Sequence, residues 1–276
     1  VLLAWEICRM LRKPIILATT SAYGWEQRPR SRFLRCMKKR LVSSCSAVIV
    51  QGRRGEEWAQ SYGVPENKIF RPFKPIRNLF KNRPRAPRKN IVLFAGRLVK
   101  QKGVEHLITS FTDVSAKFPS AKLYIVGDGP EANNLKRLAA KFSLKGRVRF
   151  FGWVSGEHLA SLYAQSRVFV LPSEYELWGR VIGEAAACGL PIVTTHAVGC
   201  VGDLVVDGYN GFIVSPNDPK RLAKAIIELL GVPTLCEKMG ERSHQIAEKW
   251  SRYRAVRAFT QAIGTTMKEI TMGNNP

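Results

Sequence analysis

Residues 91–126 read IVLFAGRLVKQKGVEHLITSFTDVSAKFPSAKLYIV, in which two short apolar runs flank a longer amphipathic segment. The runs Ile91–Ala95 and Lys122–Val126 have the length and composition of strands. Between them, Val104–Phe118 repeats its apolar residues at helical spacing. A strand, a helix and a second strand in this order form a βαβ unit, whose two strands are parallel. The stretch therefore predicts an α/β fold.

The same alternation continues to residue 230. Further strands are expected at Val148–Phe151, Val168–Leu171, Ile192–Thr195 and Phe212–Val214. Further helices are expected at Glu131–Phe142, Glu157–Ser166, Gly179–Ala187 and Pro219–Leu230. Successive βαβ units give a doubly wound, Rossmann-like parallel sheet, which binds its ligand at the carboxyl ends of the strands.

The residues before position 90 repeat the pattern less completely. Strands are expected at Ile15–Thr20 and Ala47–Gln51, and helices at Arg30–Val42 and Arg53–Tyr62. The basic stretch Pro72–Asn90 contains four prolines and has the composition of a linker. We therefore expect four parts: a partial Rossmann-like domain at 1–80, a linker at 81–90, a complete domain at 91–250, and a C-terminal helix and tail at 251–276.

The chain is strongly basic. Its 276 residues include 44 Lys and Arg against 21 Asp and Glu, a formal net charge of +23. Residues 1–90 hold 21 basic and 5 acidic residues, or +16, and the remainder holds 23 and 16, or +7. Such a charge attracts nucleic acid, anionic lipid or phosphorylated substrates. The hydrophobic content of 45 % is that of a globular protein, and no apolar run is long enough for a transmembrane helix.

The cysteines are scattered along the chain. They stand at positions Cys8, Cys36, Cys45, Cys188, Cys200 and Cys236. No Cys or His spacing is typical of a zinc site. The pattern predicts reduced thiols in a cytoplasmic protein without a disulfide framework, and we expect no signal peptide.

A basic loop bounded by glycines, Gly96–Gly103, connects the strand Ile91–Ala95 to its helix. Gly96 lets a ligand approach the backbone, and Gly103 opens the turn. Arg97 and Lys102 put two cations at a helix N-terminus, where the helix dipole also favours an anion. Because guanidinium binds phosphate bidentately and ammonium acts as a point charge, the loop suits a diphosphate. The alternative is a solvated basic loop.

Two carboxylates follow the strand Val168–Leu171. Glu176 lies in the loop and Glu184 lies in the following helix, so that both can face one cleft. Carboxylates accept hydrogen bonds from vicinal hydroxyls, so one can hold a sugar and the other a ribose. Phosphate or sugar oxygens can also bind the amides at the helix start, those of Leu177, Trp178, Gly179 and Arg180. The alternatives are a helix N-terminal charge for Glu176 and a surface residue for Glu184.

Taken together, these motifs resemble the C-terminal domain of the GT-B glycosyltransferases of family 4. The resemblance also includes VGDGP at 126–130, FG at 151–152, AACGLPIV at 186–193 and DGYNGF at 207–212. The motifs stand in the family's order over residues 90–250. Residues 13–80 resemble, more weakly, the end of the family's N-terminal domain.

The resemblance implies a retaining transfer of sugar from a UDP- or GDP-linked donor to a glycan or lipid-linked acceptor. No metal or other cofactor is required in the family. Arg97 and Lys102 are expected to hold the diphosphate and Glu176 the sugar, and these three are the expected catalytic residues. Glu184 is expected at the ribose and Trp153 near the base. The full set expected to bind the donor is Gly96, Arg97, Lys102, Trp153, Glu176, Leu177, Trp178, Gly179, Arg180 and Glu184.

The chain departs from the family pattern at three points. Where members commonly have Gly-Gly-x-x-Glu, it has Gly199–Asp203, so that Cys200 replaces a glycine and Asp203 shortens the acidic side chain. The common Glu-Gly-Phe-Gly appears as ELWG at 176–179. The glycine-rich first loop of the N-terminal domain is missing, and no histidine precedes His106. We therefore expect a fragment that lacks about half of that domain.

A dinucleotide site is one alternative interpretation. Gly127 and Gly129 follow a strand and open a helix, as in nicotinamide dehydrogenases. However, Asp128 would repel pyrophosphate and Pro130 removes an amide donor. A tight turn in the same sheet is the favoured interpretation of these glycines.

The charge of residues 1–90 raises two further alternatives. No helix-turn-helix, RNP or zinc pattern accompanies it, so nucleic-acid binding is not expected. In Arg28–Leu41 a helix would gather four apolar residues on one stripe: Phe33, Leu34, Met37 and Leu41. Surrounded by Arg and Lys, this stripe suits an anionic membrane, which would place the protein at the inner face of the plasma membrane. The alternative is a core stripe with a solvated basic face. A donor-binding fragment without transfer activity is a further possibility.

Overall fold

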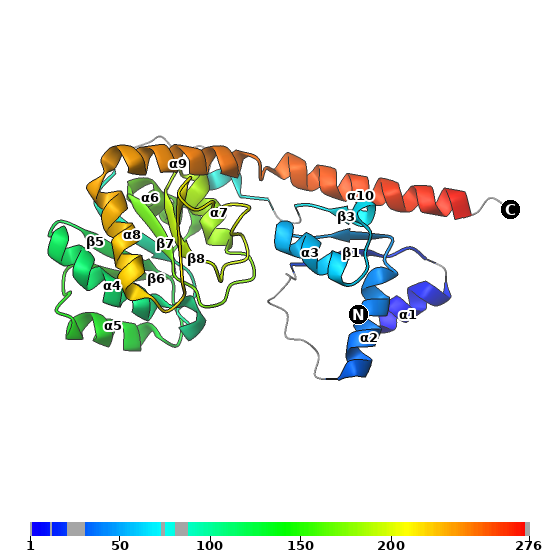
Figure 1. Cartoon of the computed structure of the whole chain (residues 1–276), viewed down its shortest axis with the longest axis horizontal. Coiled ribbons are helices and arrows are strands. Elements are labelled where there is room, and N and C mark those ends of the chain that lie inside the picture. Colours follow the sequence, from blue (N-terminus) through cyan, green and yellow to red (C-terminus); the bar gives the residue numbers. More distant parts are fainter. Residues whose placement is uncertain (1, 12, 21–30, 73–74, 81–87, 274–276) are drawn as a thin grey trace. The chain divides into compact units, whose positions relative to one another are not determined.

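The computed structural model describes residues 2–11, 13–20, 31–72, 75–80 and 88–273. It contains two compact units (Figure 1). One comprises residues 76–249, and the other combines residues 1–75 with residues 250–276. Most of the linker expected from the sequence, residues 81–87, lies outside the described residues.

A six-stranded parallel sheet forms the centre of unit 76–249, in the order β6-β5-β4-β7-β8-β9. The strands are β4 (Ile91–Ala95), β5 (Lys122–Val126), β6 (Val148–Gly152), β7 (Val168–Leu171), β8 (Ile192–Thr195) and β9 (Gly211–Val214). Every residue of β4, β7 and β8 is buried, as expected for apolar strands covered on both faces. The doubly wound α/β fold expected from the sequence is confirmed.

Among the described residues, six α-helices flank this sheet. They are α4 (Val104–Lys117), α5 (Ala132–Lys141), α6 (Gly156–Gln165), α7 (Arg180–Ala187), α8 (Pro219–Gly231) and α9 (Pro233–Glu248). Helix α4 contacts α5 and α8, whereas α7 contacts α9. Helix α9 has no counterpart among the helices expected from the sequence, because Pro233 follows α8 closely and marks a break. In the structure this proline starts the next helix, where its missing N–H costs nothing.

The strand order reverses at β4. From β4 the chain proceeds outward through β5 to β6, then returns to the other side of β4 with β7. Such a reversal is the topological switch point, where open α/β sheets bind ligands. The loops that follow β4 and β7 are therefore neighbours, and they carry most of the predicted site residues, whereas Trp153 follows β6 and Glu184 lies within α7.

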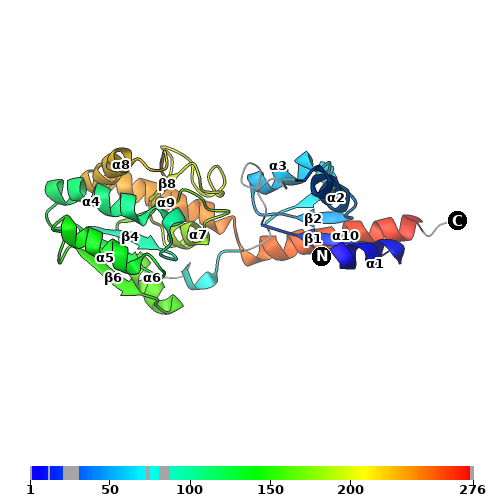
Figure 2. The same ribbon diagram turned by 90° about the horizontal axis from the view of Figure 1, so that it is seen from below.

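The second unit holds a smaller parallel sheet, in the order β1-β2-β3. Its elements are α1 (Leu2–Met10), β1 (Ile16–Ala18), α2 (Arg32–Ser43), β2 (Ala47–Ile49), α3 (Arg53–Ser61), β3 (Ile69–Phe70) and α10 (Arg252–Gly273). Helix α10 runs along one side of β1 and β2, and α2 and α3 lie on the other side (Figure 2). The expected partial Rossmann-like domain is present. Neither α1 nor β3 is among the elements expected from the sequence. Strand β3 has only two residues, too few to show a periodic pattern.

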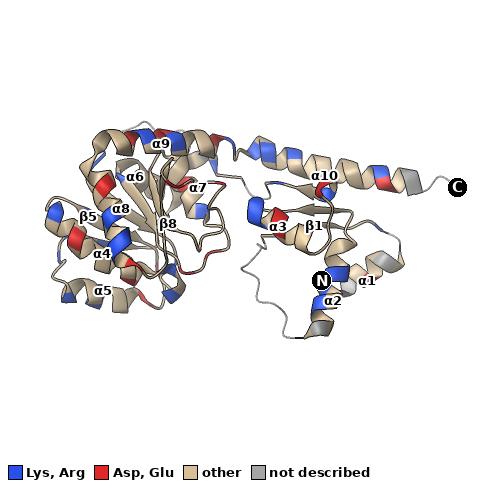
Figure 3. Ribbon diagram, viewed as in Figure 1, with Lys and Arg blue, Asp and Glu red and all other residues tan. Residues whose placement is uncertain are grey.

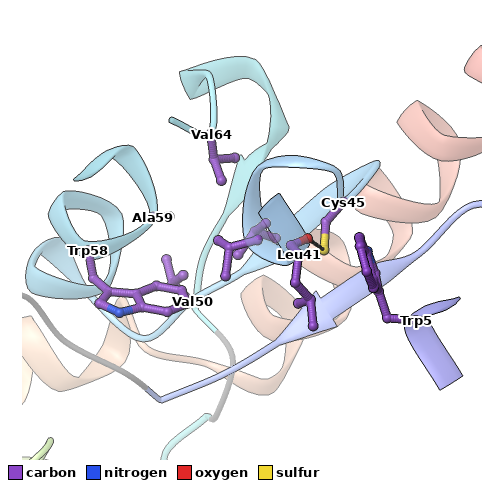
Figure 4. Close-up of a cluster of buried hydrophobic side chains, with 9 residues drawn as sticks. Trp5, Leu41, Cys45, Val50, Trp58, Ala59 and Val64 are labelled. Atoms are coloured by element: carbon purple, nitrogen blue, oxygen red, sulfur yellow. Dashed lines mark hydrogen bonds between the residues drawn. The ribbon is translucent and has the colours of Figure 1, made fainter. Parts of the chain in front are cut away.

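The side chains of β2 and of Val50, the residue after it, alternate between the two faces of the sheet, which explains why α10 belongs to this unit. Val48 and Val50 pack in one cluster with Trp58 of α3 and other apolar side chains (Figure 4). Ala47 and Ile49 point to the opposite face, because successive side chains of a strand alternate, and they pack against Ala262 of α10. The C-terminal helix therefore covers a sheet face that would otherwise be exposed.

Candidate functional site

The loops after β4 and β7 are in direct contact. The amide of Glu174 donates to the carbonyl of Gln101 at 2.8 Å. Gly103 has a φ of +62°, and a Cβ at this position would lie 2.3 Å from the carbonyl oxygen of Pro172. A side chain would thus push the two loops apart, so this close approach requires glycine.

The contact between these loops brings Lys102 onto Glu176. The Lys102 ammonium donates to Glu176 Oε2, and both side chains are largely buried. The other carboxylate oxygen of Glu176 accepts the amide of Trp178 at 3.3 Å. Two predicted site residues that are 74 positions apart in the sequence therefore form one ion pair at the switch point.

The loop after β8 fixes the backbone of Glu176. The Glu176 amide donates to the Ala197 carbonyl at 3.2 Å, and the Gly199 amide donates to the Glu176 carbonyl at 2.9 Å. Next to these bonds, the amide of Cys200 donates to the Trp178 carbonyl at 3.1 Å. Cys200 is buried and its φ is not positive, so this backbone does not need the freedom of the glycine that is common in the family. No motif in the sequence indicates this support from residues 197–200.

Arg97 is an exposed cation of the loop after β4. It follows Gly96, whose amide donates to the Val126 carbonyl at 2.9 Å, so the backbone before the guanidinium is anchored. Within the part of the chain that the structure describes, the Arg97 side chain has no hydrogen-bond or ion-pair partner. Its charge is therefore available to a ligand from solvent.

The two glycines that suggested a dinucleotide fingerprint have a packing role. A Cβ on Gly127 would lie 1.9 Å from the Gly96 carbonyl oxygen, and one on Gly129 would lie 2.4 Å from that of Leu98. The amide of Leu98 donates to the Asp128 carbonyl at 2.9 Å in the same contact. These glycines let the loops after β4 and β5 touch, which supports the tight-turn interpretation.

Glu184 has a different environment from Glu176. It lies within α7, where the Tyr163 hydroxyl from α6 donates to its Oε2 at 3.4 Å. Burial raises the pKa of Glu184, while the charge of Arg180 and the Tyr163 hydrogen bond oppose part of that rise. Among the described residues, no hydrogen bond or ion pair connects Glu184 with Glu176. No motif had pointed to Tyr163 as its partner.

Replacing Glu184 by glutamine is expected to stabilise the fold at neutral pH. Because the folded state raises the pKa above 4.5, it binds the proton more tightly than the unfolded chain. Ionisation therefore costs stability: the cost is absent below pH 4.5 and grows as the pH rises through the folded pKa. Urea unfolding near pH 7.5 should therefore find Glu184→Gln more stable than the wild type, and this difference should disappear near pH 4. The exposed Glu228→Gln is the control, and a wild type more stable than Glu184→Gln at neutral pH would refute the assignment.

Four other residues predicted to bind a donor, Leu177, Trp178, Gly179 and Arg180, lie where the loop after β7 meets the start of α7. Gly179 has a φ of +87° and forms the N-cap of α7, whose first turn has no side-chain cap. Trp178 is buried, whereas Leu177 and Arg180 are exposed. Trp153, which follows β6, is 82 % exposed and is free to stack on a planar ligand.

Across the described part of the chain, no helix has both the length and the hydropathy that crossing a bilayer demands.

Comparison with known proteins identifies sequence relatives. Residues 75–246 match the model of the family described as Glycosyl transferases group 1. The chain is 28 % identical over 264 residues to alpha-D-kanosaminyltransferase of Streptomyces kanamyceticus, covering 88 % of this chain and 68 % of that protein. It is 34 % identical over 176 residues to the lipopolysaccharide core biosynthesis glycosyltransferase LpsE of Rhizobium meliloti, covering 63 % of this chain and 50 % of LpsE. The chain thus spans about half the length of some curated relatives.

Solved structures share the fold of the whole chain. HepE of Anabaena, determined in complex with UDP, matches with a TM-score of 0.77 at 20 % identity, over 98 % of this chain and 75 % of HepE. Sucrose-phosphate synthase of Thermosynechococcus elongatus matches with a TM-score of 0.74 at 23 % identity, over 99 % of this chain and 73 % of that chain.

Proposed function

The chain belongs to the glycosyl transferases group 1, and on this premise we propose that it binds the donor of a retaining sugar transfer. The donor is a UDP- or GDP-linked sugar, and the acceptor is a glycan or a lipid-linked glycan. The observation that carries the proposal is the Lys102–Glu176 pair at the switch point, on the same loops as the exposed Arg97. The solved complex of HepE with UDP-glucose makes UDP the first ligand to test.

Each residue of the site has a part in this proposal. Arg97 and Lys102 neutralise the diphosphate as it leaves, which is the main chemical assistance that a protein gives to this reaction. Glu176 accepts hydrogen bonds from sugar hydroxyls, Glu184 from the ribose, and Trp153 lies beside the base. The bond from the anomeric carbon to the diphosphate breaks and a bond to the acceptor oxygen forms. The acceptor proton passes to a phosphate oxygen, so the reaction needs neither a metal nor a separate base.

Arg97→Ala tests the diphosphate site. A charged hydrogen bond contributes about 1.5–3 kcal/mol, so titration calorimetry should show UDP binding weakened about 10- to 100-fold. Lys100→Ala is the control, because Lys100 is an exposed cation of the same loop. If Arg97→Ala binds UDP as tightly as the wild type does, the diphosphate lies elsewhere. Transfer itself is assayed on the full-length protein.

Exposed apolar side chains in the unit of residues 1–75 favour a membrane surface as a further contact. On α1, Met10 is 77 % exposed and Ile7 lies one turn before it, and Leu11, which directly follows the helix, is also exposed. On α2, Phe33 is 69 % exposed together with Leu34. The expected stripe on this helix is divided, because Leu41 is buried in the core. Residues 28–30 of the predicted membrane segment lie outside the described residues.

The charge of α2 suits anionic lipid. The sequence of the helix, Arg32–Ser43, has no acidic residue, and blue segments on α2 in Figure 3 mark Lys and Arg. Vesicles that contain anionic lipid are expected to bind the wild-type protein at low salt. They are expected not to bind the double variant Phe33→Glu/Leu34→Glu. Ile263→Glu, at an exposed apolar position of α10, should still bind. Absence of wild-type flotation would remove the membrane from the proposal.

A further inference from the structure

A second cluster of ionisable side chains lies on the segments that carry the Lys102–Glu176 pair. Glu105 and His106 stand in the first turn of α4, and Glu174 in the loop after β7. His106 Nε2 lies 3.3 Å from Glu174 Oε1 and 3.6 Å from Glu105 Oε1. One ligand atom of each residue lies within 4.8 Å of those of the others. Two carboxylates therefore converge on a single imidazole nitrogen.

We propose that Glu105, His106 and Glu174 bind a divalent metal ion, of which Zn²⁺ fits best. In a tetrahedral site with bonds of about 2.1 Å, neighbouring ligand atoms are about 3.4 Å apart. The separations of 3.3 and 3.6 Å around His106 Nε2 match this spacing. One imidazole nitrogen and two carboxylate oxygens suit Zn²⁺ and leave a fourth position for water.

The hydrogen-bonding capacity of the cluster also favours a cation. A neutral imidazole has at most one N–H at Nε2, so it can donate to only one of the two carboxylates. A divalent ion between the three groups would interact with both carboxylates and with the nitrogen lone pair. The side chains of His106 and Glu174 are partly exposed and that of Glu105 is exposed, so an ion can enter from solvent.

This site goes beyond the proposed transfer reaction, which needs no metal. None of its three residues belongs to the set proposed to bind the donor. An ion would instead connect the first turn of α4 to the loop after β7, and these segments lie next to Lys102 and Glu176. Bound zinc is therefore expected to hold the first turn of α4 and the loop after β7 together, and to raise the melting temperature of the chain.

Zinc titration of the chelator-treated chain tests the proposal. His106→Ala and Glu174→Gln should each weaken one Zn²⁺ site by about tenfold or more, and should lose the zinc-dependent rise in melting temperature. His158→Ala is the control, because His158 is exposed and lies on α6. The wild type and the variants have the same cysteines, so zinc bound by thiols would be the same in all of them. A difference in zinc binding between these proteins therefore reports on the proposed site.

Two outcomes would overturn the site. One is equal zinc stoichiometry and affinity in the wild type and both variants. The other is a zinc-induced rise in melting temperature that His106→Ala keeps. UDP affinity measured with EDTA present reports on the donor site independently of zinc, and it should be unchanged in Glu174→Gln. A failure of the metal proposal is thereby distinguishable from a failure of the proposed donor site.

Discussion

Gly103→Ala is expected to destabilise unit 76–249 by about 3 kcal/mol and to abolish nucleotide binding. Part of the loss is the strain of alanine at a φ of +62°. The larger part is steric, because the new Cβ would lie 2.3 Å from the backbone carbonyl of Pro172. No side-chain rotation relieves that overlap, so the loops must separate. Lys102 and Glu176 would then lose their alignment.

A matched glycine separates the two causes. Gly146 also has a left-handed conformation, with a φ of +79°, but a Cβ there meets nothing within 4 Å. Gly146→Ala should therefore cost only the backbone strain, about 1 kcal/mol, and leave UDP binding intact. Urea unfolding and calorimetry of both variants provide the comparison. Equal losses in the two variants would show that the approach of Gly103 to Pro172 is not what holds the site together.

The sequence predicts the sheet and the loops of the candidate site because its signals are local. Apolar runs and glycines marked every strand of the six-stranded sheet, and the carboxyl-end rule placed Lys102 and Glu176 on neighbouring loops. The ion pair between them follows from the parallel pairing of β4 with β7, two strands that are distant in sequence. The pattern located both residues but did not predict that they would touch.

Other features have no local signal at all. Glu174 and His106 are 68 positions apart, so no motif spacing could indicate that they form a cluster. Tyr163 is one aromatic residue of an ordinary amphipathic helix, and only the packing of α6 against α7 makes it the partner of Glu184. Likewise, α10 lies far along the chain from the sheet that it covers, so its role depends on tertiary packing.

Glu176→Gln is expected to weaken binding of a UDP-sugar about 10- to 100-fold while leaving the affinity for UDP almost unchanged. Glutamine keeps the shape of the side chain and an oxygen that can accept the Trp178 amide. It loses the negative charge that would accept hydrogen bonds from the sugar hydroxyls. Calorimetry with UDP and with UDP-glucose measures the two affinities separately. Glu174→Gln, two positions away, is the control when EDTA is present.

The affinity for UDP alone distinguishes two roles of Glu176. Loss of its charge releases the Lys102 ammonium from the ion pair, so the attraction for a diphosphate should be kept or increased. If Glu176 contacts the sugar, Glu176→Gln therefore lowers the affinity for UDP-glucose and not that for UDP. If both affinities fall together, Glu176 acts by holding Lys102 in position, and the sugar is held by other residues.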